Sequence, residues 1–524
     1  MSEPLYPHYD ITVWLRSCTR EIPEPITGTI TGTIPPWLQG SLIRNGPGSI
    51  KVGDEQYGHL FDSSALLHRF NIESGAITYQ CRFVQSEVFK RNRAANRIVF
   101  TEFGTKAVPD PCKTIFDRVA AIFRPNDHPD NSMISVYPFE DELYAFGEMP
   151  IIHKIDQVSL ETIDRVNVSD FVSIVHHTSH PHVMNDGTVF NLALTTYPTG
   201  SYHSIVKFPP KFGKKSMFEQ AEIVAGIPVR WNLHPTYMHS FGITENYFIL
   251  VEHPFSMSVS AMVANKIKDE PLAGSFRWYQ HEKTRISLIS RKSGKLSHRF
   301  YSQTFFFFHI INQYEVGDYV IIDICTYRDA APLEGMYIEA MQNMQHNPNY
   351  AEMFRSKPLR FVLPLNPTKT KTNLIQLELT HAEAYYQPDG TILLKPEQII
   401  DQGCETPRIN YNHSGKQYRY FYAISADVDS ANPGTIIKVD TTLKICKTWC
   451  EDNCYPSEPI FVPRPNGQSE DDGVVVAVLL WGKGVTNRVG LVVLDGRDMT
   501  ELGRAEFETP GEVPRCLHGW FLPK

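Results

Sequence analysis

Glycine-centred turns followed by runs of β-branched and aromatic residues recur along this chain of 524 residues. Three examples are SG before AITYQCRF at 74–83, NDG before TVFNLAL at 185–194, and DDG before VVVAVLLW at 471–481. Glycine adopts the positive φ that tight hairpins need, and the runs that follow suit a pleated sheet. Helical patterns are few, the clearest lying at 334–344 and 113–123. The pattern predicts an all-β, mostly antiparallel fold.

No low-complexity linker or short repeat divides the chain, so we expect one domain over residues 1–524. The longest apolar stretches, at 305–311 and 474–481, fall short of the roughly 20 residues that span a bilayer and predict buried strands. Residues 1–10 lack the pattern of a secretory signal, which favours synthesis in the cytoplasm. The formal charge of −8 argues against nucleic acid as a partner.

The nine cysteines are odd in number and dispersed, which indicates reduced thiols rather than a disulfide framework. Cys446, Cys450 and Cys454 lack the paired C-x-x-C spacing of a zinc site, and the stretch around them predicts a strand.

Four histidines lie where predicted strands meet turns: His180, His239, His309 and His518. They are separated by about 60, 70 and 210 residues, and a four-stranded propeller blade with its loops is about as long as either of the first two separations. Because a propeller brings the start of each innermost strand near a central channel, this spacing favours a β-propeller in which the four side chains meet.

Four neutral imidazoles suit Fe(II), Zn(II), Cu(II) or Ni(II). Glu148, Glu405 and Glu458 occupy similar positions between predicted strands and turns. A metal-bound histidine usually donates its other ring N–H to a carboxylate or carbonyl, so we expect these glutamates one layer outside the metal.

Several neighbouring histidines have simpler interpretations. His176, His177 and His182 crowd His180, but alternation along a strand turns adjacent side chains to different faces. We expect His68 to make a structural hydrogen bond.

The sequences around the four histidines resemble the iron-histidine motifs of the carotenoid cleavage oxygenase family: HPHVMNDGT at 180–188, HSFG at 239–242, HIINQYE at 309–315 and LHGWF at 517–521. Three further stretches are similar to the same family: GSLIRNGPG at 40–48, HLFDSSALLHRF at 59–70 and YPSEPIFVPRP at 455–465. The resemblance runs from about residue 20 to the last residue. It is greatest to the animal branch, which includes β-carotene oxygenases, retinoid isomerohydrolases and insect carotenoid isomerooxygenases.

This resemblance implies a seven-bladed β-propeller with Fe(2+) on its axis and a helical, apolar dome over a substrate tunnel. By motif match, the iron ligands are His180, His239, His309 and His518. The second-layer glutamates are Glu148, Glu405 and Glu458, expected to orient His239, His309 and His518 respectively.

Phe103 matches a position where family members line the cleft near iron with an aromatic residue, so we expect it to contact substrate, with an ordinary core phenylalanine as the alternative. Tyr327 is a second candidate for the same lining. One departure is Gly147, because many vertebrate members have threonine before the first glutamate. It leaves the shape of the tunnel at this point open.

By the same resemblance, the expected reaction is oxidative cleavage of a carotenoid by O2, at the central 15,15' double bond, to retinal-type aldehydes. Isomerisation of one half from trans to 11-cis is expected to accompany it. The alternatives are eccentric cleavage of a carotenoid, a retinyl-ester isomerohydrolase that uses iron as a Lewis acid, and a propeller that binds carotenoid or a protein without turnover. The sequence identifies no protein partner.

A carotenoid is insoluble in water, so we expect the tunnel mouth to contact a membrane. Residues 87–124 carry eight basic against four acidic side chains, beside the apolar positions of 113–123, which fits an interfacial helix drawn to anionic lipid. The apolar stretch 255–263 is expected to flank the mouth. Cys112 matches a cysteine acylated in the eye isomerohydrolase, with an ordinary thiol as the alternative. These features predict a cytoplasmic protein attached peripherally to intracellular membranes through Cys112, Phe116 and Ile122.

Overall fold

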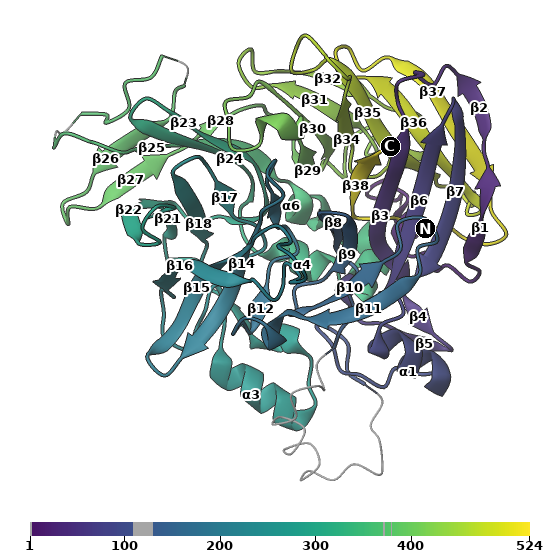
Figure 1. Cartoon of the computed structure of the whole chain (residues 1–524), viewed down its shortest axis with the longest axis horizontal. Coiled ribbons are helices and arrows are strands. Elements are labelled where there is room, and N and C mark those ends of the chain that lie inside the picture. Colours follow the sequence, from purple (N-terminus) through teal and green to yellow (C-terminus); the bar gives the residue numbers. More distant parts are fainter. Residues whose placement is uncertain (1–2, 108–128, 370–371, 379) are drawn as a thin grey trace.

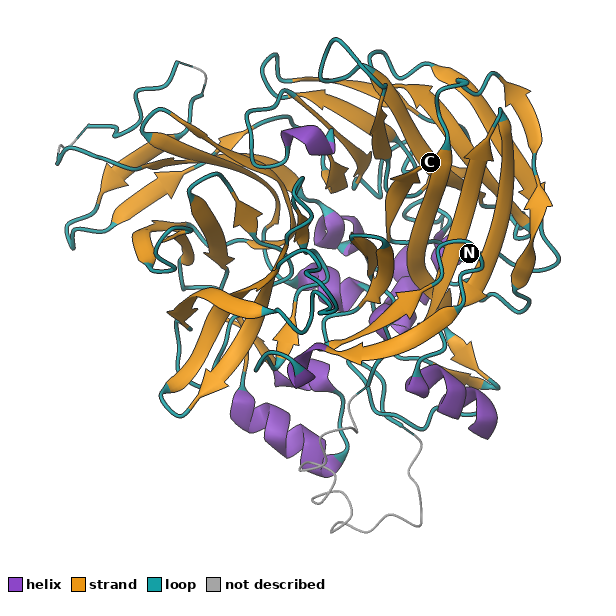
Figure 2. Ribbon diagram, in the orientation of Figure 1, coloured by secondary structure: helices purple, strands orange, loops and turns teal. Residues whose placement is uncertain are grey.

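The computed structural model describes residues 3–107, 129–369, 372–378 and 380–524. These residues form seven sheets of four to six strands around a common axis, a seven-bladed β-propeller (Figures 1 and 2). Almost all pairings between strands are antiparallel, and the exception joins β22 and β27. The predictions of an all-β fold and of seven blades are therefore confirmed.

The first four blades follow one another along the chain. Blade 1 contains β8 (Ser135–Phe139), β9 (Glu142–Phe146), β10 (Ile151–Ile155) and β11 (Thr162–Asn167). Blade 2 contains β12 (His176–His177), β13 (His182–Val183), β14 (Val189–Tyr197), β15 (Gly200–Phe208) and β16 (Glu222–Pro228). Blade 3 contains β17 (Gly242–Ile243), β18 (Tyr247–Glu252), β21 (Thr284–Ser290) and β22 (Leu296–Ser302), extended by β26 (Glu383–Tyr386) and β27 (Ile392–Lys395). Blade 4 contains β23 (Phe306–Val316), β24 (Tyr319–Tyr327), β25 (Lys357–Pro364) and β28 (Glu397–Gln398).

The last two blades combine strands from both ends of the chain. Blade 5 comes before these two blades and uses consecutive strands: β29 (Cys404–Arg408), β30 (Tyr420–Ser425), β31 (Ile436–Asp440) and β32 (Ile445–Trp449). Blade 6 contains β33 (Cys454–Pro456), β34 (Ile460–Pro463), β35 (Gly473–Trp481), β36 (Arg488–Asp495) and β37 (Glu501–Glu508), with β2 (Thr29–Gly32) at its outer edge. Blade 7 contains β38 (His518–Pro523), β3 (Gly40–Ser49), β6 (Ser64–Glu73), β7 (Ala76–Phe83) and β1 (Ile22–Thr27).

The ring closes where β38 pairs antiparallel with β3, with His518 opposite Asn45. A close backbone approach makes this pairing dependent on glycine at position 519. A Cβ atom there would lie 2.4 Å from Arg44 Cδ and 2.5 Å from the Ile43 carbonyl oxygen. Strand β2 provides a second closure by pairing with β37.

The innermost strands contact one another around the axis. Strand β38 contacts β8 and β34, β8 contacts β13, and β23 contacts both β17 and β29. Apolar side chains fill the space between blades, and the largest cluster joins blades 3, 4 and 5 through residues such as Val251, Ile322 and Phe421. The apolar runs predicted as buried strands are found in β23 and β35, with most of their side chains buried.

Five of the short helices and 3-10 turns, those that begin at Ile11, Leu60, Ala331, Ile338 and Tyr350, line one cavity at the axis and form a helical cover over it. The described helices are α1 (Glu87–Ala95), α3 (Val259–Lys268), α4 (Ala331–Gly335), α5 (Ile338–Gln342) and α6 (Tyr350–Phe354), with 3-10 turns η1 (Ile11–Trp14), η2 (Leu60–Asp62), η3 (Val168–Asp170), η4 (Leu272–Ser275), η5 (Met344–His346) and η6 (Tyr411–His413). Two two-stranded sheets, β4 (Lys51–Val52) with β5 (Glu55–Gln56) and β19 (Phe255–Met257) with β20 (Phe276–Trp278), lie outside the blades. None of the helices in the described ranges is long and apolar enough to cross a bilayer.

The helical prediction at 334–344 is confirmed in part, because α4 ends at Gly335, α5 covers Ile338–Gln342, and the chain breaks between them. Met336 accepts a hydrogen bond from the Leu60 N–H, and the Ile338 N–H donates to the Gly58 carbonyl. The backbone at the break therefore pairs with another segment instead of continuing the helix. The other predicted helix, at 113–123, lies entirely within the segment 108–128, outside the described residues.

Candidate metal centre

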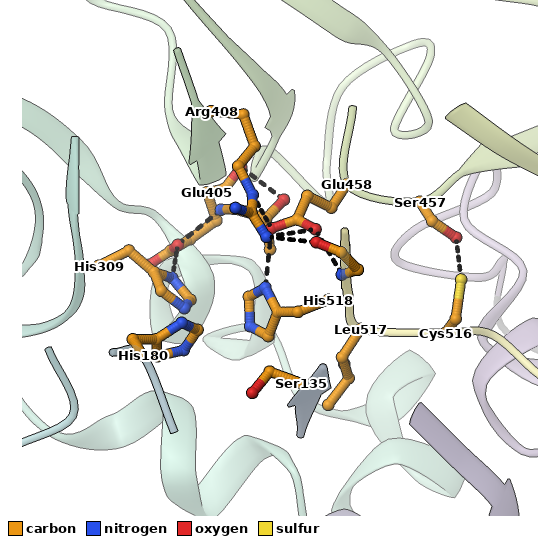
Figure 3. Close-up of polar contacts among 12 residues, drawn as sticks. Ser135, His180, His309, Glu405, Arg408, Ser457, Glu458, Cys516, Leu517 and His518 are labelled. Atoms are coloured by element: carbon orange, nitrogen blue, oxygen red, sulfur yellow. Dashed lines mark hydrogen bonds and ion pairs between the residues drawn. The ribbon is translucent and has the colours of Figure 1, made fainter. Parts of the chain in front are cut away.

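The four histidines predicted as ligands come from four blades and meet on the axis. One ring nitrogen of each lies within 4.8 Å of a ring nitrogen of every other one: His180, His239, His309 and His518. Figure 3 shows three of these rings facing one another. No carboxylate belongs to this group, so the donor set consists of imidazoles.

Irregularities in the innermost strands aim these side chains at the axis. His180 lies in the gap between β12 and β13, beside Pro181, which has no N–H for strand pairing. His309 lies where the register of β23 shifts, and His518 is the first residue of β38. A bulge re-aims a side chain that would otherwise alternate between the two faces of its sheet.

Glu148, which follows β9, holds His239 from the outside. Its Oε1 accepts a hydrogen bond from His239 Nδ1 at 2.6 Å and one from the Tyr237 hydroxyl at 2.7 Å. The preceding residue is Gly147, where a Cβ atom would lie 2.8 Å from the Asn131 carbonyl oxygen. The backbone is therefore close-packed on the side where a larger residue would place its Cβ atom.

Glu405, in β29, holds His309 in the same way. Its Oε2 accepts from His309 Nδ1 at 2.6 Å and from the Thr406 N–H at 2.7 Å (Figure 3). Thr406 has a φ of 49°, a conformation that a β-branched residue rarely adopts. This strained backbone points its N–H at the carboxylate.

Glu458, between β33 and β34, holds His518 and is itself surrounded by cations. Its Oε1 lies 2.8 Å from His518 Nδ1 and 2.7 Å from Arg408 Nε (Figure 3). Its Oε2 lies 3.0 Å from Nη1 of the fully buried Arg44. The Gly519 N–H adds a further donor at 3.1 Å.

Burial sets the protonation of the imidazoles. It lowers the pKa of His180 well below its ordinary value, and His518 and His239 lower it further. Burial lowers the pKa of His518 to about 4 despite the opposing effect of Glu458. These rings are therefore neutral near pH 7, which is the form that binds a metal ion.

The carboxylates keep their charge. Burial acts to raise the pKa of Glu405, but His309 lowers it below the ordinary value overall. Burial likewise acts to raise the pKa of Glu458, and Arg408 and His518 outweigh it. Each carboxylate can therefore accept a ring N–H and fix the tautomer of its histidine.

Two cavities meet the imidazoles. The first, of about 200 Å³, reaches His239, His309 and His518 and is lined mainly by apolar side chains of the helical cover, including Trp14, Phe61, Met336 and Phe354. The second, of about 350 Å³, reaches His180, His309 and His518 and carries polar groups such as Arg408 and Asn412.

Of the residues predicted to contact substrate, Tyr327 lines the apolar cavity. Phe103 lies in an aromatic cluster beside it, with its ring centroid 5.7 Å from that of Phe61, which lines the cavity. Phe255 and Trp278 belong to the same cluster, which extends away from the metal centre.

The residues predicted to contact a membrane are only partly placed. Cys112, Phe116 and Ile122 lie outside the described residues. Within the stretch 255–263, Phe255 is buried in the aromatic cluster next to Phe103, whereas the apolar residues that continue into α3 are not buried. Val263 in that helix is 40% exposed.

The neighbouring histidines bond elsewhere. His177 Nδ1 lies 2.8 Å from the Thr178 carbonyl oxygen, and His182 Nε2 lies 2.9 Å from the Phe241 carbonyl oxygen. His68 makes a structural hydrogen bond between its Nδ1 and the Tyr79 hydroxyl at 2.9 Å, as the sequence predicted.

Sequence reasoning missed four residues that contact the centre: Tyr137, Tyr237, Thr406 and Arg408. The last three lie within three positions of a motif residue, so nearness to the motifs was a usable signal. Tyr137 lies in a strand pattern typical of a core residue and gave none.

The buried His68 predicts a stability change with pH in the metal-free protein. Burial lowers its folded pKa from 6.5 to about 3, so only the unfolded chain takes up this proton as the pH falls below 6.5. His68 therefore removes about 1.4 kcal/mol of unfolding free energy per pH unit between those values. The unfolding free energy, measured with urea from pH 6.5 to 5, should therefore fall less steeply with decreasing pH for His68→Gln than for the parent chain.

The control variant is Tyr79→Phe, which removes the hydrogen-bond partner but keeps the titrating ring. It should lower the unfolding free energy without changing the slope. Equal slopes for His68→Gln and the parent chain would show that this ring is protonated to the same extent in both states.

Comparison with known proteins agrees with the fold and the motifs. The sequence profile of the family described as "Retinal pigment epithelial membrane protein" matches residues 15–523. The chain is 55% identical to the carotenoid isomerooxygenase of Galleria mellonella, with 100% of this chain and 98% of that protein covered. It is 49% identical to the carotenoid isomerooxygenase of Drosophila melanogaster, over 99% and 94%, and 37% identical to the β,β-carotene 15,15'-dioxygenase of Gallus gallus, over 96% and 97%.

Among solved structures, cobalt-substituted Synechocystis apocarotenoid oxygenase superposes with a TM-score of 0.78 at 21% identity, covering 99% of this chain and 100% of that one. At that identity the likeness concerns the fold. The matched family profile and the full-length relatives concern the sequence itself, and the chain therefore belongs to the retinal pigment epithelial membrane protein family, the carotenoid cleavage oxygenases that its motifs resemble.

Proposed function

We propose that this protein holds Fe(II) through His180, His239, His309 and His518 and uses O2 to cleave a carotenoid to aldehydes. The observation that carries the proposal is the convergence of four imidazoles, without a carboxylate, at the end of an apolar cavity. Relatives at 55% and 49% identity are named carotenoid isomerooxygenases, which favours coupled isomerisation, and the Gallus gallus relative favours the central 15,15' bond.

The side chains fit a divalent metal ion. His309 Nε2 is buried and has no hydrogen-bond partner, and His180 Nε2 lies only 3.1 Å from His239 Nε2. The glutamates occupy Nδ1 of three rings, so Nε2 of these rings is left for a metal. Neutral imidazoles with ordered outer carboxylates are ligands that iron accepts.

Bound iron would supply the electron transfer that lets O2 react with a spin-paired alkene. The protein binds the polyene, orients it and keeps water away from the imidazoles. The apolar cavity excludes water from the imidazoles, and the aromatic cluster around Phe103 and Phe255 extends the apolar surface for a polyene longer than the cavity. Tyr327, which faces the Glu405 carboxylate, places one hydroxyl in this apolar wall.

Oxygen dependence tests the reaction. Purified protein loaded with Fe(II) is incubated under air and under argon with β-carotene, with zeaxanthin and with retinyl palmitate, and the products are resolved by chain length and isomer. We expect aldehydes from the carotenoids under air alone, with an 11-cis half. Turnover of the ester alone, equal under argon, would establish the isomerohydrolase instead, and unequal aldehydes would establish eccentric cleavage.

Removal of one ligand tests the iron site. His309→Ala should lose most iron and activity, because it removes one donor of four. Glu405→Gln keeps the shape of the side chain but not its charge, and we expect a loss of about 10- to 100-fold in iron affinity or activity. Metal analysis after dialysis and initial rates measure both.

The exposed His281 provides a matched control, and His281→Ala should keep iron and rate. Retention of full iron and turnover by His309→Ala would reject the ligand assignment. A parent chain that neither binds iron nor turns over a carotenoid would favour a propeller that only binds its ligand.

Peripheral membrane contact is the last part of the proposal. It is supported by the basic excess at 87–124 and by α3, which has no buried residue and carries Val259, Met262 and Val263. Phe116→Asp with Ile122→Asp, and separately Val263→Asp, should reduce flotation with vesicles containing phosphatidylserine, because a buried charge opposes insertion of an apolar face.

Val158→Asp is the control, since Val158 is 66% exposed in the turn between β10 and β11. It should float like the parent chain. If all the variants fold and float equally, neither segment is the membrane face.

A further inference from the structure

The fourth imidazole differs from the other three in what holds it. His239, His309 and His518 each direct Nδ1 at a glutamate. His180 directs Nδ1 at the phenol oxygen of Tyr137, 3.2 Å away, while its Nε2 faces the centre. Tyr137 is buried in β8, the innermost strand of blade 1, the next blade in the ring.

Arg408 links this phenol to the Glu458 carboxylate. Its guanidinium donates to Glu458 through Nε at 2.7 Å and Nη2 at 3.2 Å, and to the Gly519 carbonyl oxygen at 2.9 Å. Its positive charge also acts on the Tyr137 phenol, whose pKa it lowers against the larger effect of burial. Tyr137, Arg408 and His180 all line the cavity of about 350 Å³.

These contacts form a continuous chain from His180 through Tyr137, Arg408 and Glu458 to His518. Arginine has donors only, so the Tyr137 oxygen does not donate to the guanidinium beside it and can accept the N–H of His180. A neutral imidazole that carries its proton on Nδ1 has its free lone pair on Nε2. The phenol therefore does for His180 what a carboxylate does for the other rings.

We propose that Tyr137 and Arg408 are positioning residues that hold His180 with Nε2 toward the metal and join it to the Glu458–His518 pair. The inference rests on the proposed iron site and goes beyond its four histidines and three glutamates.

Arg408 also distinguishes Glu458 from the other glutamates. Two guanidinium groups, of Arg44 and Arg408, contact Glu458. Glu148 instead accepts from a phenol, and Glu405 from a backbone N–H. A carboxylate that is paired with cations accepts a weaker hydrogen bond from the N–H of its histidine. The His518 ring is therefore a less electron-rich donor than the rings of His239 and His309. Loss of the Arg408 charge should therefore lower the reduction potential of bound iron.

The test compares Tyr137→Phe, Arg408→Gln and the double variant with the parent chain. The matched control is Tyr144→Phe, because Tyr144 lies opposite Tyr137 in the same blade and its hydroxyl donates to Glu142 at 2.7 Å. The measurements are the rate of Fe(II) loss to a chelator, the reduction potential, and the exchangeable ring N–H signals of the Co(II)-loaded protein by paramagnetic NMR.

We expect Tyr137→Phe to lose iron about 10- to 100-fold faster, the range found for partners of metal ligands, and to lose protection of one ring N–H signal. Arg408→Gln should lower the potential, and Arg408→Lys should restore it toward the parent value. The effects of Tyr137→Phe and Arg408→Gln on iron loss should be non-additive, because both act through one chain of contacts.

Equal iron loss by Tyr137→Phe and Tyr144→Phe, with all ring N–H signals intact, would overturn the inference while leaving the iron site in place. A parent chain that binds neither Fe(II) nor Co(II) would overturn the iron site as well. If Tyr137→Phe does not fold, Arg408→Gln decides, since an unchanged potential and an unchanged rate of iron loss would both contradict the role of Arg408.

Discussion

Convergence of the innermost strands on one axis is the constraint on which the rest of this molecule depends. Four blades each contribute one imidazole, and no two of the four lie close in sequence. Small departures from regular pairing, such as the gap at Pro181 and the register shift at His309, aim the rings inward. A regular inner strand would turn alternate side chains away from its neighbours across the axis.

The surroundings of the centre are polar on one side and apolar on the other. The helical cover presents apolar side chains to three rings, whereas the opposite cavity brings Arg408 and Asn412 near the centre. Three glutamate side chains lie outside the rings, and two guanidinium groups contact one of them, Glu458. Apolar side chains therefore make up most of the wall on the side where an apolar polyene would lie, and Glu405, Glu458 and Arg515 are its charged members.

Much of this was accessible from the sequence, and the rest was hidden for physical reasons. Glycine turns and histidine spacing indicated the blades, because both follow from local chain geometry. The motifs indicated Glu148, Glu405 and Glu458, which the structure places against three of the rings. Tyr137 and Arg408 were not predicted, since a strand tyrosine resembles any core residue and the hydrogen-bond partners of Arg408, Glu458 and Gly519, lie 50 and 111 residues away. The broken helix near 336 depends on pairing with residues 58–60, which no local pattern encodes.

The closure of the ring by β38 has a consequence for synthesis on the ribosome. Strand β38 supplies both the partner of β3 and the imidazole of His518, and it is translated after every other strand that the structure describes. During elongation, β3 therefore keeps an open edge, and the six earlier blades assemble around an incomplete donor set. A premature stop codon shortly before His518 would spare almost all of the core and still yield a product that neither closes its ring nor completes its metal site.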